Sequence, residues 1–552
     1  MNHPISVLSG VLSTTMMMLC AALPAAAQPR ALSCAELGRI SVPNAVITTA
    51  QVNPASTSPL IPAHCEIIGK IDERVGADGK PYAIGFHLRL PADWNGRFLF
   101  QGGGGTDGLL GDALGGGAIN QGYAVVSTDA GHVTEPVPGI GGALFGLDPQ
   151  ARIDYGYRAL DVTTRTAKLI VKLRYGRPPR YSYFVGCSNG GRQGMVASQR
   201  FPDHFDGIVA GDPGFNLPQA AVTEAWDAQA FAIAATQNDS NGQPYLPTTF
   251  SDADLTLTVN AILSRCDGLD GLVDGIIDNV PACRFDPVEL QCEGAKRETC
   301  LSLPQVAALR SVFAGARDSG GQALYSSFPW DAGLAAPGWR VWKIGFPAPP
   351  EAPLVNNAIN LTLGATALPY IFVTPPVPVP ANGLAKYMMN FNFELEAPKI
   401  FQTSGIYAQS SMEFMSANST DLDEFQRRGN KLIVYHGGSD PVFSVNDTID
   451  WYRRLLKDTH GRADRFARLF IVPGMNHCSG GPCTGMFDAL AAVVDWVEHD
   501  RAPERIMASA GPATPWPGRT RPLCPYPKQA RYNGSGDINN AANFTCEAPD
   551  GR

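Results

Sequence analysis

Short apolar runs, rich in aromatic and β-branched residues, recur near both ends of the chain and predict buried strands. They cover residues 97–101, 122–129, 181–185, 205–211, 431–436 and 467–472. Two longer segments, 157–174 and 487–498, repeat their apolar residues at helical spacing instead. Strands that alternate with helices are typical of a mostly parallel sheet covered by helices.

The alternation spans residues 28–215, stops, and resumes at about Gly429. The intervening residues, 216–428, carry four cysteines and many prolines. We therefore expect an α/β core in two parts, 28–215 and 429–552, with a large domain inserted between a core strand and a core helix. This inserted domain would fold over the functional site as a lid that excludes water and shapes a pocket. The last residues, 501–552, are expected to form a disulfide-tied tail without regular structure.

The turn after the strand at 181–185 has the pattern Gly-x-Ser-x-Gly, with Ser188 between Gly186 and Gly190. In this pattern a sharp turn from strand to helix lifts the serine hydroxyl above the edge of the sheet. Small residues follow at 191–198 and would let a helix pack closely. An ordinary glycine-rich turn is the alternative, but the preceding strand favours a nucleophile.

A serine hydroxyl needs a base to remove its proton, and the base needs an acid to orient it. Asp440 and His477 each follow a predicted strand, and the order Ser, Asp, His is that of the α/β-hydrolase fold. We therefore predict an α/β-hydrolase core in which Ser188, Asp440 and His477 form a catalytic triad. A turn-forming role before Pro441 is the alternative for Asp440. His436, at a strand end, is interpreted as a satisfied core histidine.

Four consecutive glycines, 102–105, follow the predicted strand at 97–101. Such a loop resembles the oxyanion loop of esterases and lipases, where backbone N–H groups bind the developing negative oxygen. We expect Gly104 or Gly105 to supply one donor and the N–H of Asn189 to supply the other. A nucleotide-binding loop is disfavoured, because neither of its glycine spacings is present.

Composition narrows the class of partner and the compartment. The 552 residues are 44% hydrophobic and 17% charged, with a net charge of −8 spread without long runs, so neither nucleic acid nor an anionic membrane is indicated. Residues 1–27 resemble a signal peptide cleaved after Ala27, although they lack Lys and Arg. No later segment is long and apolar enough to span a bilayer. The protein is expected to be secreted or periplasmic, and its oligomeric state stays open.

Of the twelve cysteines, Cys20 lies in the expected leader, so eleven remain for the mature chain. Export together with this number implies disulfides. Spacing suggests four local pairs, namely Cys34–Cys65, Cys266–Cys283, Cys292–Cys300 and Cys524–Cys546. Cys187 with Cys478 would be the long-range pair. Cys483 is left over. The sequence alone does not fix the connectivity, but the distant pair would hold Ser188 and His477 on neighbouring corners of one crosslink.

Residues 266–276 combine aspartates with glycines in a pattern that suits a hard cation bound by oxygen. We expect structural calcium to be held by the carboxylates of Asp267, Asp270 and Asp274 and the carbonyls of Leu272 and Ile276. This is not an EF-hand loop, because the spacing and the final glutamate differ. A turn cluster without metal is the alternative. Because the loop lies far along the chain from Ser188, its role is assigned to stability of the lid.

These motifs together resemble the tannase and feruloyl esterase family. The matching segments are Gly-Cys-Ser-Asn-Gly-Gly at 186–191, Ser-Asp-Pro at 439–441, Gly-Met-Asn-His-Cys at 474–478 and the aspartate-rich loop at 267–276. The resemblance covers nearly the whole mature chain. It implies an α/β-hydrolase core with a lid, a structural calcium, and a disulfide between the nucleophile and histidine loops.

Members of this family hydrolyse esters of plant phenolic acids, so the resemblance implies a serine carboxylesterase for esters of ferulate, gallate or chlorogenate, acting through an acyl-enzyme. A hydrolase of mono(2-hydroxyethyl) terephthalate is the alternative within the family. That enzyme holds the free carboxylate with a lid arginine, whereas residues 352–385 contain no charged residue. Arg340 or Lys343 could substitute, but we favour an uncharged aromatic acyl group. Tyr370, Phe372 and Phe443 are candidate pocket walls, with core packing as the alternative.

Two other classes remain open from the sequence. A peptidase could use the same triad. A calcium-dependent protein that binds aromatic ligands with an inactive triad would bind without hydrolysis. The intact serine, aspartate and histidine favour the esterase.

Overall fold

The computed structural model describes residues 1, 30–346 and 358–549. The expected leader, apart from Met1, lies outside the described residues, as does part of the uncharged segment 352–385. Among the described residues, no helix is long and apolar enough to cross a membrane.

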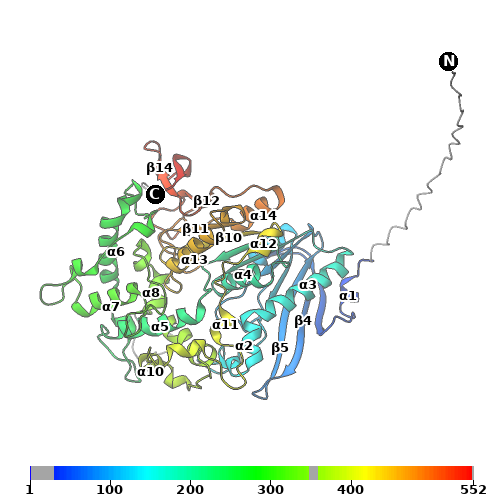
Figure 1. Ribbon diagram of the computed structural model, residues 1–552, viewed down its shortest axis with the longest axis horizontal. Helices are drawn as coiled ribbons and strands as arrows, with labels where there is room; N and C mark the ends of the chain where they lie inside the picture. The colour runs from blue at the N-terminus through cyan, green and yellow to red at the C-terminus, as the bar shows by residue number, and fades with distance from the viewer. Residues whose placement is uncertain (2–29, 347–357, 550–552) are drawn as a thin grey trace.

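A nine-stranded mixed sheet organises the chain (Figure 1). In spatial order its strands are β1 (Ala45–Asn53), β4 (His64–Val75), β5 (Pro81–Pro91), β7 (Ala124–Thr128), β6 (Arg97–Gln101), β8 (Tyr181–Cys187), β9 (Gly207–Gly211), β10 (Lys431–Gly437) and β11 (Ala467–Val472). Neighbours from β1 to β7 run antiparallel, and neighbours from β7 to β11 run parallel. The parallel half confirms the predicted α/β-hydrolase core.

Helices cover both faces of the parallel strands, as their apolar runs predict. The core helices are α3 (Ala159–Tyr175), α4 (Asn189–Arg200), α13 (Val445–Asp458) and α14 (Ala489–His499). Phe98 and Phe100 of β6 face the side covered by α3, α4 and α13, whereas Leu99 between them faces α14. Because successive side chains of a strand point to opposite faces, a strand buried on both faces reads as a continuous apolar run.

The N-terminal part differs from the expected alternation. After the short helix α1 (Cys34–Leu37), strands β1, β4 and β5 follow one another as an antiparallel meander, with no helix between them among the described residues. A two-stranded ribbon, β2 (Ser56–Thr57) and β3 (Leu60–Ile61), joins β1 to β4. Several outward positions on β1 and β4 are exposed. Their apolar residues therefore do not form the continuous runs that revealed the buried strands.

The segment between β9 and β10 adds helices but, in the part described, no strand to the large sheet. Its helices are α5 (Leu217–Ala232), α6 (Asp252–Cys266), α7 (Leu303–Ala314), α8 (Pro337–Lys343), α9 (Ala365–Ala367), α10 (Leu384–Met389), α11 (Ser411–Met415) and α12 (Asp423–Arg427). Figure 1 shows most of these green and yellow helices gathered at the end of the molecule opposite β4 and β5.

The inserted segment is tied to the two loops that carry Asp440 and His477. Asp331, just before the 3-10 turn η8 (Ala332–Ala335), accepts hydrogen bonds from the Gly474 N–H at 2.7 Å and the Ser439 hydroxyl at 2.9 Å. The Asn476 side chain donates to the carbonyls of Gly333 and Ser439. The loops of the core thus share one buried network with the insertion.

The expectation that the C-terminal tail lacks regular structure is wrong, because residues 501–549 contain short strands. Strands β12 (Ile506–Ser509) and β13 (Thr520–Leu523) pair antiparallel, as do β14 (Gln529–Tyr532) and β15 (Phe544–Glu547). Each strand has only four residues, and prolines and glycines separate them. An alternating pattern this short and interrupted is not recognisable as a strand.

Five disulfides are present among the described residues, and they join the four local pairs suggested by spacing and the expected distant pair. They are Cys34–Cys65, Cys187–Cys478, Cys266–Cys283, Cys292–Cys300 and Cys524–Cys546. Cys483 is a buried free thiol among the described residues, and burial raises its pKa to about 12. It therefore stays protonated at physiological pH.

Candidate active site

The turn between β8 and α4 presents Ser188 with the backbone that a nucleophile elbow requires. Ser188 has φ 66° and ψ −125°, a strained conformation for a residue with a side chain. The turn is tight because a Cβ on Gly186 would lie 2.6 Å from the carbonyl carbon of Gly190. Only glycines allow the strand and the helix to approach this closely.

The three residues of the predicted triad are brought together above the carboxyl ends of β8, β10 and β11. The Nε2 atom of His477 lies 2.8 Å from the Ser188 Oγ, and its Nδ1 atom lies 2.8 Å from Asp440 Oδ2. The other oxygen of Asp440 accepts the N–H groups of Val442 and Phe443, at 2.7 and 3.1 Å. The imidazole is thus placed to take the serine proton while the carboxylate fixes its orientation.

The pKa shifts of Asp440 and His477 suit a histidine base that is supported by an ionised carboxylate. Burial alone would raise the pKa of Asp440, but the charge of His477 and hydrogen bonds from His436 and His477 hold that pKa far below its usual range. Burial alone would lower the pKa of His477, yet the Asp440 carboxylate raises it overall. Asp440 therefore stays negative through neutral pH and stabilises the imidazolium that forms when His477 accepts a proton.

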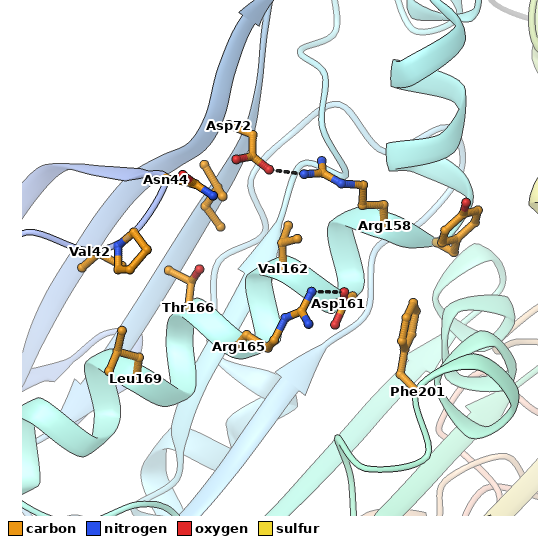
Figure 2. Close-up of a pocket in the computed structure, with 13 residues that line it drawn as sticks. Val42, Asn44, Asp72, Arg158, Asp161, Val162, Arg165, Thr166, Leu169 and Phe201 are labelled. Carbon is orange, nitrogen blue, oxygen red and sulfur yellow. Dashed lines mark hydrogen bonds and ion pairs between the residues drawn. The ribbon is translucent and has the colours of Figure 1, made fainter.

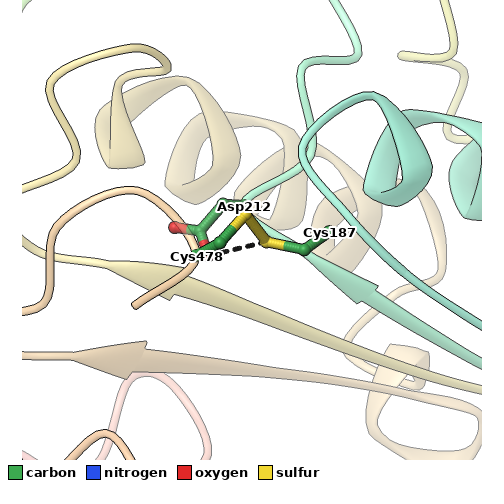
Figure 3. Close-up of side chains that lie close together, drawn as sticks. All are labelled: Cys187, Asp212 and Cys478. Carbon is green, nitrogen blue, oxygen red and sulfur yellow. Dashed lines mark hydrogen bonds between the residues drawn. A yellow bond between two sulfur atoms is a disulfide. The ribbon is translucent and has the colours of Figure 1, made fainter. Parts of the chain in front are cut away.

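A disulfide clamps the nucleophile loop to the histidine loop. Cys187 precedes Ser188, Cys478 follows His477, and the Cα atoms of the two cysteines lie 6.0 Å apart. Figure 3 shows the bridge beside Asp212, whose Oδ2 atom lies 3.5 Å from the Cys187 Sγ. Burial, with the repulsion of Asp440, raises the pKa of Asp212 to about 7. The crosslink constrains the two reacting side chains through the backbones on which they stand.

The expected oxyanion donors differ in whether their N–H groups already have an acceptor in the protein. The N–H of Gly104 donates to Asp107 Oδ1 at 2.9 Å, so it is engaged within its own loop. For the N–H groups of Gly105 and Asn189 we find no acceptor among the described residues, and the Gly105 carbonyl is held by the Tyr155 hydroxyl at 3.0 Å. Gly105 and Asn189 are thus the members of the expected set whose N–H groups remain available.

Asp107, which sequence reasoning missed, organises this loop. Its Oδ2 atom accepts the side-chain amides of Asn189 at 2.8 Å and Gln193 at 2.9 Å, and burial raises its pKa to about 7. A Cβ on Gly103 would lie 1.8 Å from Asp107 Oδ1, so the loop needs glycine there. The signal in the sequence was an acidic residue two positions after the glycine run.

Two aromatic rings stand edge-on against His477. Phe443 lies 5.3 Å and Trp342 of α8 lies 5.4 Å from the imidazole, measured between ring centroids. Phe443 was an expected wall, whereas Trp342 was missed because α8 lies in the segment without a recognisable pattern. Tyr370 and Phe372 are instead buried in the core of the insertion, where the Tyr370 hydroxyl donates to the Val379 carbonyl at 2.8 Å. Their described contacts support the packing alternative.

The two cations considered as partners for a substrate carboxylate have protein partners instead. Lys343 is 2% exposed and forms a buried ion pair with Asp227. Arg340 donates to the carbonyls of Pro247 and Phe250, at 3.1 and 3.0 Å. Both side chains are therefore used to hold α8 against its neighbours.

The acidic loop begins at η5 (Asp267–Asp270), at the end of α6, and the Cys266–Cys283 disulfide encloses it. Asp267 accepts the N–H groups of Asp274 and Gly275. Burial and the charges of its acidic neighbours raise the pKa of Asp270 to about 7. A further acid, Asp278, was missed by the sequence analysis, and burial and the Asp270 charge raise its pKa as well. Asp274 pairs with Arg521 of β13 in the tail.

A separate groove of about 570 Å³ lies between α3 and the residues just before β1. Figure 2 shows its charged side chains paired with one another, Arg158 with Asp72 and Arg165 with Asp161. It contains none of the triad residues. The groove is therefore separate from the site formed by Ser188, Asp440 and His477.

Comparisons with known proteins identify the family to which the chain is similar. A family model described as tannase and feruloyl esterase matches residues 65–547. The mono(2-hydroxyethyl) terephthalate hydrolase of Piscinibacter sakaiensis is 48% identical over 90% of this chain and 87% of its own. A probable feruloyl esterase of Arthroderma benhamiae is 30% identical over 83% and 81%. Among solved structures, feruloyl esterase B from Aspergillus oryzae superimposes with a TM-score of 0.71 at 25% identity, covering 93% of this chain and all of that one, 100%.

Proposed function

The chain belongs to the tannase and feruloyl esterase family and is a carboxylic ester hydrolase, and from that premise we propose that Ser188, His477 and Asp440 hydrolyse esters of uncharged aromatic acids. The observation that carries the proposal is the position of one imidazole, 2.8 Å from the serine hydroxyl on one side and 2.8 Å from the carboxylate on the other.

The reaction proceeds in two halves. Ser188 Oγ attacks the ester carbonyl while His477 Nε2 accepts its proton, and the N–H groups of Gly105 and Asn189 bind the resulting oxyanion. The tetrahedral intermediate collapses when His477 returns the proton to the leaving alcohol, which produces an acyl-enzyme. Water, deprotonated by the same imidazole, then releases the acid and restores Ser188. Asp440 remains ionised throughout.

An uncharged acyl group is proposed because Arg340 and Lys343, the two cations considered for a substrate carboxylate, already have protein partners. A terephthalate monoester would bring a carboxylate close to Trp342 and Phe443, yet the neighbouring Lys343 is neutralised by Asp227. Burying an unpaired carboxylate is costly. Esters of ferulate and gallate, and the caffeoyl ester chlorogenate, present a neutral acyl ring instead. The relative from Piscinibacter sakaiensis favours the terephthalate monoester as the second candidate.

We expect kcat/KM for methyl ferulate or methyl gallate to exceed that for mono(2-hydroxyethyl) terephthalate by about tenfold or more, because only the latter carries an uncompensated charge into the site. The measurement is a steady-state comparison of these esters at pH 7. A neutral terephthalate diester is the matched control, because it keeps the ring and loses the charge. A preference for the anionic monoester over this diester would reject the proposed acyl class.

Two further parts of the proposal concern the insertion and the compartment. The insertion contributes Trp342 to the site and is proposed to act as the lid that shapes the acyl pocket. The five disulfides favour an oxidising compartment, and with the leader-like residues 1–27 they support secretion.

A structural calcium ion at the acidic loop is proposed on the chemistry of its donor set. The carboxylates of Asp267, Asp270 and Asp274 and the carbonyls of Leu272 and Ile276 are all hard oxygen ligands. Their crowding already raises the pKa of Asp270 to about 7, through burial and the charges of Asp274 and Asp267. A divalent cation would relieve this repulsion and stabilise the loop.

Calcium should raise the melting temperature by about 2 to 5 °C when it is present at a hundredfold excess over its Kd. The measurement is thermal unfolding with added calcium and with chelator. Asp270→Asn should abolish the difference, because it removes one charged ligand, whereas Glu289→Gln, an exposed acid of the same segment, should preserve it. An equal response to chelator in wild type and Asp270→Asn would contradict the site.

A further inference from the structure

The acid of the proposed triad contacts a second histidine. His436 is the penultimate residue of β10 and its side chain is fully buried. Its Nε2 atom lies 3.0 Å from the Phe443 carbonyl oxygen and 3.3 Å from Asp440 Oδ2. Its Nδ1 atom lies 2.7 Å from the Thr448 hydroxyl of α13. The sequence assigned His436 to the core, and its burial agrees, but its contact with the acid was not expected.

These partners fix where the ring carries its proton. A carbonyl and a carboxylate only accept hydrogen bonds, so Nε2 must carry hydrogen and donate toward both. A hydroxyl can donate or accept, so Thr448 satisfies Nδ1 whether or not that nitrogen is protonated. His436 therefore donates to Asp440 in either charge state. The same carboxylate oxygen, Oδ2, also accepts from His477 Nδ1.

We propose that His436 is a positioning residue of the catalytic machinery, which holds the Asp440 carboxylate in line with His477 and shares its Oδ2 atom. The proposal rests on the proposed esterase function, and His436 acts through Asp440 without touching substrate. Together with the Val442 and Phe443 N–H groups, it leaves the carboxylate bound from both sides.

Several titratable groups face His436 from the elements packed around it. Asp212, after β9, lies 3.9 Å from Nε2, and its Oδ1 atom accepts the Gly437 N–H at 2.8 Å. Asp447 of α13 acts on the ring through its charge, and the side chains of Asn216 and Ser326 donate hydrogen bonds to it. Burial lowers the pKa of His436, while the hydrogen bond to Asp440 and the charge of Asp212 raise it overall.

The contact between His436 and Asp440 shifts the pKa of His477, the proposed base, in a definite direction. A donor on Oδ2 withdraws part of the negative charge that Asp440 offers to His477, and a charged His436 repels a proton on His477. His436 therefore lowers the pKa of His477 relative to a site without it. Since the reaction needs neutral His477, removing His436 should move the acidic limb of the kcat/KM profile to higher pH.

The test compares His436→Met, which removes both ring nitrogens, with His436→Gln, which keeps a carboxamide N–H. For His436→Met we expect the acidic limb of the kcat/KM profile to move to higher pH by about one unit. We also expect kcat to fall about tenfold or more, with KM nearly unchanged. His436→Gln should recover part of both changes. His204→Gln is the matched control, because His204 is also buried against an aspartate, Asp161, away from the triad. The His204→Gln variant should leave the pH of the acidic limb unchanged.

The outcomes separate this inference from the esterase assignment. If turnover depends on Ser188 but the His436 variants keep the wild-type limb and kcat, the positioning role is wrong and the esterase assignment stands. If turnover does not depend on Ser188, the esterase assignment itself fails. Nitrogen NMR of the histidines in the wild-type protein provides a test that needs no variant. A His436 ring protonated only at Nδ1 would overturn the inference.

Discussion

Ser188→Ala should lower kcat for methyl ferulate by about four orders of magnitude or more, with little change in KM. The hydroxyl is the only part of the site that forms the acyl-enzyme bond, and losing a triad nucleophile typically costs this much because the rest of the site cannot replace it. The variant keeps its backbone and the neighbouring disulfide, so substrate can still bind. Steady-state kinetics on the purified variant provide the measurement.

A matched control comes from the same helix. Ser198 lies in α4 and its hydroxyl donates to the Met195 carbonyl at 2.8 Å, away from the triad. Ser198→Ala should therefore keep kcat within about twofold, since it changes only one hydrogen bond of modest net value. Labelling with a serine-directed phosphonate should modify the wild type at one position and should not modify Ser188→Ala. Undiminished turnover in Ser188→Ala would reject the nucleophile.

Replacing both Cys187 and Cys478 with alanine should lower kcat about 100-fold and destabilise the protein by up to about 5 kcal/mol. The stability loss follows from the entropy of a chain closed over 291 residues, and the kinetic loss follows from small displacements of two reacting groups. Urea unfolding and steady-state kinetics measure the two effects separately.

The Cys292–Cys300 pair gives the comparison, because it closes only 8 residues within the insertion. Its removal should cost about 2 to 3 kcal/mol and leave kcat unchanged. If the Cys187 and Cys478 double variant retains kcat while it loses stability, the crosslink supports the fold without positioning the catalytic groups. Equal losses of stability in both double variants would contradict the loop-length argument.

The parallel core and the meeting of Ser188, Asp440 and His477 could be predicted from the sequence, because both depend on local signals. Buried strands appear as apolar runs, and the triad residues follow directly after such runs, at Ser188, Asp440 and His477. Parallel strands place their carboxyl ends at one edge, so residues far apart in the chain were expected to meet. The expected Cys187–Cys478 pair, which the structure contains, would bring the loops of Ser188 and His477 together.

The features that escaped prediction depend on contacts between segments that carry no periodic pattern. Trp342 reaches His477 from an irregular part of the insertion, and Asp107 acts through Asn189 and Gln193 of another element. His436 resembled an ordinary strand end, because only the folded loop brings Asp440 against its ring. Tyr370 looked like a pocket wall by composition, yet burial and a backbone hydrogen bond place it in the interior.

The order of the triad along the polypeptide has a consequence for biosynthesis. The serine and the histidine are 289 positions apart, with the whole insertion between them. Domains synthesised from the N-terminus begin to fold before the rest of the chain exists. A ribosome-bound or partly translocated chain would hold its nucleophile without the imidazole that activates it. Ester cleavage by the proposed triad therefore requires synthesis of the chain beyond β11, the last strand of the large sheet along the chain.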